Sequence, residues 1–146
     1  MRKLLLTVLA VVLMAPAVLA GEVVETDVLR RGHARPDSYR DIGIYVTTRQ
    51  EYRSLWQDFG FRGDRPGVSF QRRRLVFIAT HESGSCPLRF ERTRLNNEER
   101  RLIVRLSNGV SDRTACTDDW VPRSFVLSHK RSQLPAGELS VRIRRV

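Results

Sequence analysis

The sequence predicts a mainly β fold: a small antiparallel β-sandwich or curled sheet of six to eight strands, with one amphipathic helix packed on it. Short runs rich in β-branched and aromatic residues recur along the chain, separated by turn-forming residues. Residues 48–59 repeat apolar side chains at helical spacing, and no internal repeat or heptad pattern accompanies them. Together these observations favour one β domain that carries a single helix.

Each predicted strand follows from its own pattern. Residues 75–80 (LVFIAT) are apolar without alternation, which indicates a central strand buried on both faces. In residues 100–106, Leu102, Val104 and Leu106 alternate with polar positions, so the three apolar side chains should face the core. We expect strands at 22–29, 41–47, 75–80, 88–95, 100–106, 124–128 and around 139–143, with a short extended segment at 68–70.

The predicted helix begins with a capping box, in which Thr48 is the N-cap and Glu51 follows three residues later. Gly60 is the expected end of the helix. The apolar stripe consists of Tyr52, Leu55, Trp56 and Phe59. A stripe of this kind indicates packing against a core rather than a ligand site.

The first 20 residues have the pattern of a secretory signal peptide. Arg2 and Lys3 form a positive start, residues 4–14 are apolar apart from one threonine, and small residues precede a cleavage point after Ala20. An uncleaved membrane anchor is the alternative, because the apolar run is close to the lower length limit for a bilayer span.

Gly21 and Glu22 follow the cleavage point, where a lipoprotein would carry a cysteine. We therefore expect a soluble protein, periplasmic or secreted, with no transmembrane anchor after cleavage. Its expected parts are an N-terminal strand and polar loop at 21–40 and a single β domain at 41–146.

The chain is strongly basic. Its net charge is +10, and removing Arg2 and Lys3 with the signal peptide lowers it to +8. Beyond the signal peptide, Lys130 is the one lysine among the basic residues. Arginine suits phosphate and carboxylate recognition, although a genome rich in arginine codons would give the same bias. The charge should attract anionic polymers weakly and in a salt-dependent manner.

Cys86 and Cys116 are the two cysteines of the chain. In an exported protein this pair predicts a disulfide, which should stabilise the fold by about 3–4 kcal/mol for a loop of this length. Loops held on a rigid β scaffold commonly carry recognition. The candidate binding loops contain Glu82, Ser83, Gly84, Ser85, Asp118, Asp119 and Trp120.

The stretch HESGSCP, beginning at His81, also holds residues that serve catalysis or metal binding elsewhere. It lacks the G-x-S-x-G elbow of serine hydrolases and the second histidine of an H-E-x-x-H metalloprotease. Three alternatives remain open: a hydrolase or metalloenzyme using His81 and Glu82, a zinc site that adds Cys86, Cys116 and His129, and a thiol enzyme. We predict no catalytic residue, cofactor or metal.

Several arginines occupy outward positions of the predicted strands. They are Arg89, Arg101, Arg105, Arg142 and Arg144. If the strand order brings them together, they form one basic sheet face. The alternative is that they are ordinary solvated positions on separate strands. The densest run, residues 72–74, abuts the buried strand and is not accompanied by exposed aromatic residues that would stack on bases.

A further prediction comes from the order of several motifs. They are Tyr52-x-x-Leu55-Trp56, Val68-Ser69-Phe70, Leu75 to Ala79, the turn Ser83 to Pro87, and the tail from Ala115 to Pro135. In this order they resemble a family of small exported β-domains that includes the C-terminal domain of a bacterial protease-complex protein. The family usually has a Gly-Gly-Tyr-like step where Gly84-Ser85-Cys86 stands here. The resemblance implies an all-β module that binds other proteins, with no catalytic residue to transfer.

Three functions follow from these patterns. The first is a non-catalytic exported β-module that binds a protein partner in the envelope. The second is an arginine-rich protein that binds a cell-surface polymer or nucleic acid. The third is the hydrolase or metalloenzyme that uses His81 and Glu82.

Overall fold

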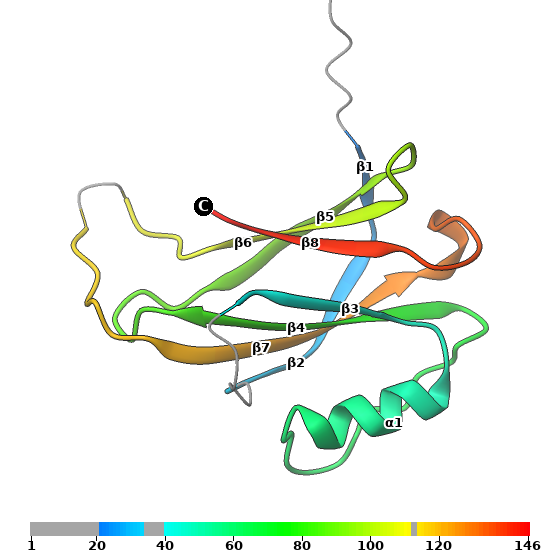
Figure 1. The fold of residues 1–146 in the computed structure, drawn as a ribbon, viewed down its shortest axis with the longest axis horizontal. Helices are drawn as coiled ribbons and strands as arrows, with labels where there is room; N and C mark the ends of the chain where they lie inside the picture. Colours follow the sequence, from blue (N-terminus) through cyan, green and yellow to red (C-terminus); the bar gives the residue numbers. More distant parts are fainter. Residues whose placement is uncertain (1–20, 34–39, 112–113) are drawn as a thin grey trace, which may run out of the picture.

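The fold is a two-sheet β-sandwich with one helix packed on it (Figure 1). The structure is a computed structural model that describes residues 21–33, 40–111 and 114–146. The predicted fold class is confirmed, whereas the predicted signal peptide lies outside the described residues.

Each sheet contains four strands. Sheet I has the order β1 (Glu22–Val24), β5 (Arg89–Asn96), β6 (Arg101–Ser107) and β8 (Ser140–Arg145). Sheet II has the order β2 (Thr26–Gly32), β7 (Val121–Lys130), β4 (Arg73–Glu82) and β3 (Ile42–Val46). A short 3-10 helix, η1 (Arg131–Gln133), leads from β7 in sheet II toward β8 in sheet I.

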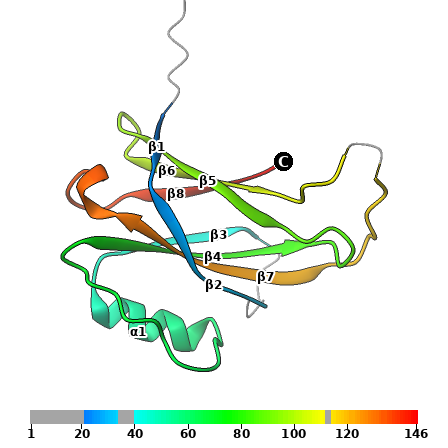
Figure 2. The same cartoon turned by 180° about the vertical axis from the view of Figure 1, so that it is seen from behind.

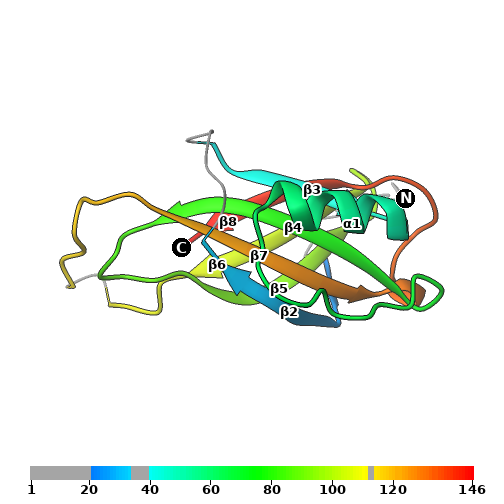
Figure 3. The same cartoon turned by 90° about the horizontal axis from the view of Figure 1, so that it is seen from below.

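The helix α1 (Arg49–Asp58) covers the face of sheet II that points away from sheet I (Figures 1 and 3). The Thr48 side chain accepts a hydrogen bond from the Glu51 amide at 3.2 Å, and the Glu51 carboxylate accepts one from the Thr48 amide at 3.0 Å. The predicted capping box is therefore present. The helix thus lies on a sheet face, not across one end of the sandwich.

The central strands of sheet II, β4 and β7, are buried on both sides, because sheet I covers one face and the helix covers the other. On the inner side, Val76, Ile78, Phe125 and Leu127 cluster with Leu102, Val104 and Leu106 of sheet I. On the helix side, Tyr52, Trp56 and Phe59 cluster with Val46, Leu75, Phe77 and Val126. This arrangement explains the unbroken apolar run in β4, where alternate residues enter different cores.

Two elements differ from the sequence prediction. The strand expected at 22–29 divides at Glu25, so that β1 joins sheet I and β2 joins sheet II (Figure 2). The last strand, β8, runs parallel to β6, whereas the other paired strands are antiparallel. Because the chain crosses from sheet II to sheet I between β7 and β8, β8 can join sheet I with the same strand direction as β6. Residues 68–70, expected as a short extended segment, belong to neither sheet.

Candidate functional site

The outer face of sheet I is rich in arginine. The five arginines predicted for a basic face all belong to this sheet: Arg89 on β5, Arg101 and Arg105 on β6, and Arg142 and Arg144 on β8. The side chains that alternate with them on β6 are fully buried in the inner core. Because side chains alternate between the faces of a strand, the arginines point away from that core.

Two further arginines, Arg92 and Arg94 on β5, belong to the same face. The strand register places Arg92 beside Arg105, and Arg105 beside Arg144, so three arginines form a row across three strands. In the next row, Ile103 separates Arg94 from Arg142. The seven side chains, here called the arginine face, are Arg89, Arg92, Arg94, Arg101, Arg105, Arg142 and Arg144.

Sequence analysis missed Arg92 and Arg94 because β5 contains a bulge. The register shifts between Phe90 and Arg92, where Glu91 is the extra residue. Simple alternation from Arg89 would place Arg92 and Arg94 in the core, whereas the bulge turns both outward. The sequence signal was the spacing of two apolar residues: Leu88 and Leu95 are both buried although they are seven positions apart. An odd spacing places two side chains on opposite faces of a regular strand.

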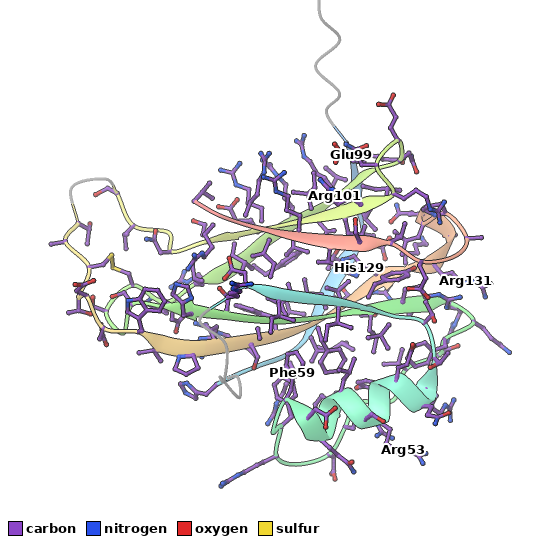
Figure 4. All side chains as sticks on the ribbon, viewed as in Figure 1. Arg53, Phe59, Glu99, Arg101, His129 and Arg131 are labelled. Atoms are coloured by element: carbon purple, nitrogen blue, oxygen red, sulfur yellow. A yellow bond between two sulfur atoms is a disulfide. The ribbon has the colours of Figure 1, made fainter. Side chains whose placement is uncertain are left out.

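Two acidic side chains partly neutralise the arginine face. Glu91 lies 2.6 Å from Arg105 Nε, and Glu99 accepts a hydrogen bond from Arg101 Nη1 at 2.8 Å. Both pairs are partly exposed, so each contributes little to stability. Seven arginines and these two glutamates leave five positive charges. Figure 4 shows Arg101 and Glu99 on the side of the molecule opposite Arg53 of the helix.

The candidate binding loops meet in a cleft at the end of the sandwich opposite Arg131 (Figure 4). Cys86 and Cys116 form the predicted disulfide and hold the two loops together. The cleft encloses about 400 Å³ and is here called the disulfide cleft. Its lining includes Glu82, Ser83, Asp118, Asp119 and Trp120 from the predicted loops.

A network of hydroxyl and carboxylate groups joins the two loops beside the disulfide. Thr117 Oγ1 lies 2.9 Å from Ser83 Oγ and 3.0 Å from Ser85 Oγ. Asp119 accepts hydrogen bonds from Thr117 and from the Gly84 amide. These bonds, chiefly the one from Thr117, lower the pKa of the Asp119 carboxyl. A Cβ atom at position 84 would come too close to this carboxylate, so a side chain there would displace Asp119.

His81 and Trp120 form the aromatic side of the cleft. Their rings stack with centroids 4.0 Å apart, and Trp120 remains 56% exposed. His81 Nε2 lies 2.6 Å from Arg145 Nη1, and Arg145 Nε lies 3.4 Å from Asp41. Burial, followed by the charge of Arg145, lowers the pKa of the His81 imidazole. The neutral ring can therefore accept a hydrogen bond from the guanidinium.

Glu82 has a structural position at the floor of the cleft. Its carboxylate accepts hydrogen bonds from the Leu88 amide at 2.6 Å and from Arg123 Nε at 2.7 Å. Arg123 Nη2 donates a second bond to the same carboxylate. The Glu82 side chain is 1% exposed. Both of its carboxylate oxygens are engaged in holding the turn before β5 and the start of β7.

The thiol-based alternatives conflict with the disulfide, because a zinc thiolate or a catalytic thiol needs a free sulfur. Both cysteines of the chain are bonded to each other. His129 lies in the inner core, where its Nε2 is 2.9 Å from Thr93 Oγ1. Across the described residues, no group of three or more metal-ligating side chains gathers at one point.

A second cavity, of about 770 Å³, lies beside the basic run at residues 72–74. Three of the four cationic side chains that line it are engaged in local contacts. Arg73 pairs with Asp27 and donates to Ser128 Oγ at 2.8 Å. Lys130 pairs with Glu25, and Arg131 donates to the Gln71 carbonyl. Because neighbouring groups already hold these side chains, this cavity is a weaker candidate than the arginine face.

No family model, curated protein or solved structure matches the chain. The resemblance to the protease-complex domain therefore stays a prediction. Within the described ranges, no helix combines the length and apolar character needed to cross a membrane. The disulfide agrees with export to an oxidising compartment.

Proposed function

We propose that the chain is a non-catalytic exported β-module that binds a polyanion on its arginine face. One observation supports this function above the others: the sheet register gathers seven arginines from three strands on one side of the molecule. The proposal favours the second of the three functions predicted from the sequence.

The row of Arg92, Arg105 and Arg144 supports the proposal energetically. Like charges directly opposite each other on neighbouring strands destabilise a sheet by several tenths of a kcal/mol per pair. Glu91, which pairs with Arg105, reduces this repulsion, and a bound polyanion would remove what is left. Each guanidinium can also donate two parallel hydrogen bonds to a phosphate or carboxylate. The sheet holds the strands at fixed spacing, which lowers the ordering cost of binding.

The test uses inorganic polyphosphate as the probe and two variants of equal net charge. One variant carries Arg142→Gln and Arg144→Gln on β8, and the control carries Arg49→Gln and Arg53→Gln on the helix. Binding is measured by isothermal titration calorimetry at several salt concentrations. We expect the β8 variant to lose affinity and to lower the salt slope by about two, one for each phosphate contact removed. Equal losses in both variants would contradict the proposal.

A protein partner at the disulfide cleft is the second candidate function. The observation in its favour is the exposed Trp120 ring at a cleft whose two loops are tied by a disulfide. Exposed aromatic side chains in such positions are common anchors of protein interfaces. A photo-crosslinker at Asp118 should yield a specific product in the envelope that Trp120→Ser abolishes and the helix variant retains. A product pattern unchanged by Trp120→Ser would argue against this site.

A further inference from the structure

The arginine face extends in two dimensions. Its arginines lie on three adjacent strands, which span about 10 Å at the usual strand spacing. Along the strands, the Arg89–Ser107 pair and the Asn96–Arg101 pair mark the two ends. Three steps of two residues separate these pairs, which corresponds to about 20 Å. A single polymer strand needs a narrow track of charge, whereas this patch matches an anionic surface.

Two apolar side chains lie among the arginines. Ile103 sits between Arg94 and Arg142, and Val23 of β1 lies beside Arg94. Val23 is 53% exposed. A soluble polyanion gives such side chains no favourable contact, whereas the boundary between lipid headgroups and acyl chains does. The long arginine side chains can lie along this apolar surface and still reach phosphates with their charged ends.

The composition of the face argues against nucleic acid. The outward residues of β5, β6 and β8 are Arg, Asn, Glu, Ser and Ile. None is aromatic, so the face offers no stacking platform for bases, which single-stranded nucleic-acid sites commonly use.

The chain also enters its fold at this sheet. The predicted signal peptide ends at Ala20, and Glu22 already belongs to β1 of sheet I. The strand β1 begins on the side of the molecule where Arg101 lies (Figures 1 and 4). The sheet that bears the arginine face is therefore the part of the domain that directly follows the predicted signal peptide.

From these observations we infer that the polyanion is an anionic phospholipid bilayer, which the arginine face and Val23 contact together. The inference rests on the proposed function and narrows its ligand to a membrane surface. Guanidinium groups bind lipid phosphates, and the apolar side chains enter the headgroup boundary. The helix and the disulfide cleft then face away from the bilayer or stand at its side, where other molecules can reach them.

The test is co-sedimentation of the oxidised mature protein with vesicles of phosphatidylcholine, with or without about one third of the anionic lipid phosphatidylglycerol. We expect binding that requires the anionic lipid. The β8 variant, Arg142→Gln with Arg144→Gln, should bind about thirtyfold more weakly, since each basic residue near such a surface contributes about fivefold. The helix variant, Arg49→Gln with Arg53→Gln, should bind like the parent protein.

A second arm tests the apolar contact. In Val23→Trp, we expect the added tryptophan to shift its emission to shorter wavelength on anionic vesicles and to show no shift with polyphosphate. Binding to vesicles without that shift overturns the bilayer contact. Polyphosphate binding without vesicle binding overturns this inference and leaves the proposed function standing. If the parent protein binds neither polyphosphate nor anionic vesicles, both the proposed function and the bilayer inference are overturned. If the β8 variant and the helix variant bind vesicles equally weakly, the arginine face is not the binding surface.

Discussion

Lowering the pH from 7.5 to 5.0 should destabilise the protein by about 2 kcal/mol through one buried side chain, His129. His129 is fully buried between the two sheets, where Thr93 contacts its Nε2 (Figure 4). Burial, followed by the charge of Arg73, lowers the pKa of His129 to about 3. The folded protein therefore keeps this ring neutral throughout the range.

The direction of this pH effect follows from the pKa of His129 in the unfolded and folded states. An unfolded histidine has a pKa of about 6.5 and gains a proton as the pH falls below that value. The folded state does not gain one until about pH 3. The contribution of His129 to stability is therefore present above pH 6.5 and is lost between pH 6.5 and pH 3. At pH 5.0 the loss covers 1.5 pH units at about 1.4 kcal/mol each, or about 2 kcal/mol.

The assay is urea unfolding at both pH values with the disulfide intact, for the parent protein and for His129→Gln. Glutamine keeps a polar group near Thr93 but does not titrate. Other titrating groups, such as His81, change the stability of both proteins alike. The change in unfolding free energy between pH 7.5 and pH 5.0 is therefore compared between the parent protein and His129→Gln, and the difference isolates His129. The parent should lose about 2 kcal/mol more than the variant. An equal pH effect in both proteins would refute the reasoning.

Three further predictions concern stability, each measured by the free energy of urea unfolding at pH 7.5. Replacing Cys86 and Cys116 by serine should cost about 3–4 kcal/mol, because the unfolded chain loses its cross-link; a cost below about 1 kcal/mol would contradict this. Glu82→Gln should cost about 3 kcal/mol, because it leaves the mostly buried Arg123 guanidinium without its carboxylate, and Glu82→Asp should cost less. Thr48→Ala should cost about 1 kcal/mol through loss of the helix cap, whereas Thr48→Ser should be nearly neutral.

Local patterns predicted the local elements well. The capping box and the aromatic stripe placed the helix within one residue at either end, because both are set by contacts within a few residues. The alternation in β6 separated buried Leu102 and Val104 from the outward arginines for the same reason. The disulfide followed from an even cysteine count and the predicted export.

Features that depend on contacts between distant parts of the chain could not be predicted from local sequence patterns. Nothing in the pattern at 22–29 reveals that the chain changes sheets at Glu25, because each half is paired with a different distant strand. The strand order, which decides whether the arginines share a face, is also a property of non-local pairing. Arg92 and Arg94 were missed because one bulged residue reverses the facing of every side chain that follows it.

The change of sheets at Glu25 also sets the order in which the molecule can fold. The strand β2 pairs with β7, and the Glu25 amide donates at 2.7 Å to Gln133 Oε1, 108 residues further along the chain. When the N-terminus emerges first, β1 must wait for β5, and β2 must wait for β7, which lies close to the C-terminal end of the chain. Such distant pairing makes folding slow. The sandwich can consequently close only after its C-terminal strands are available.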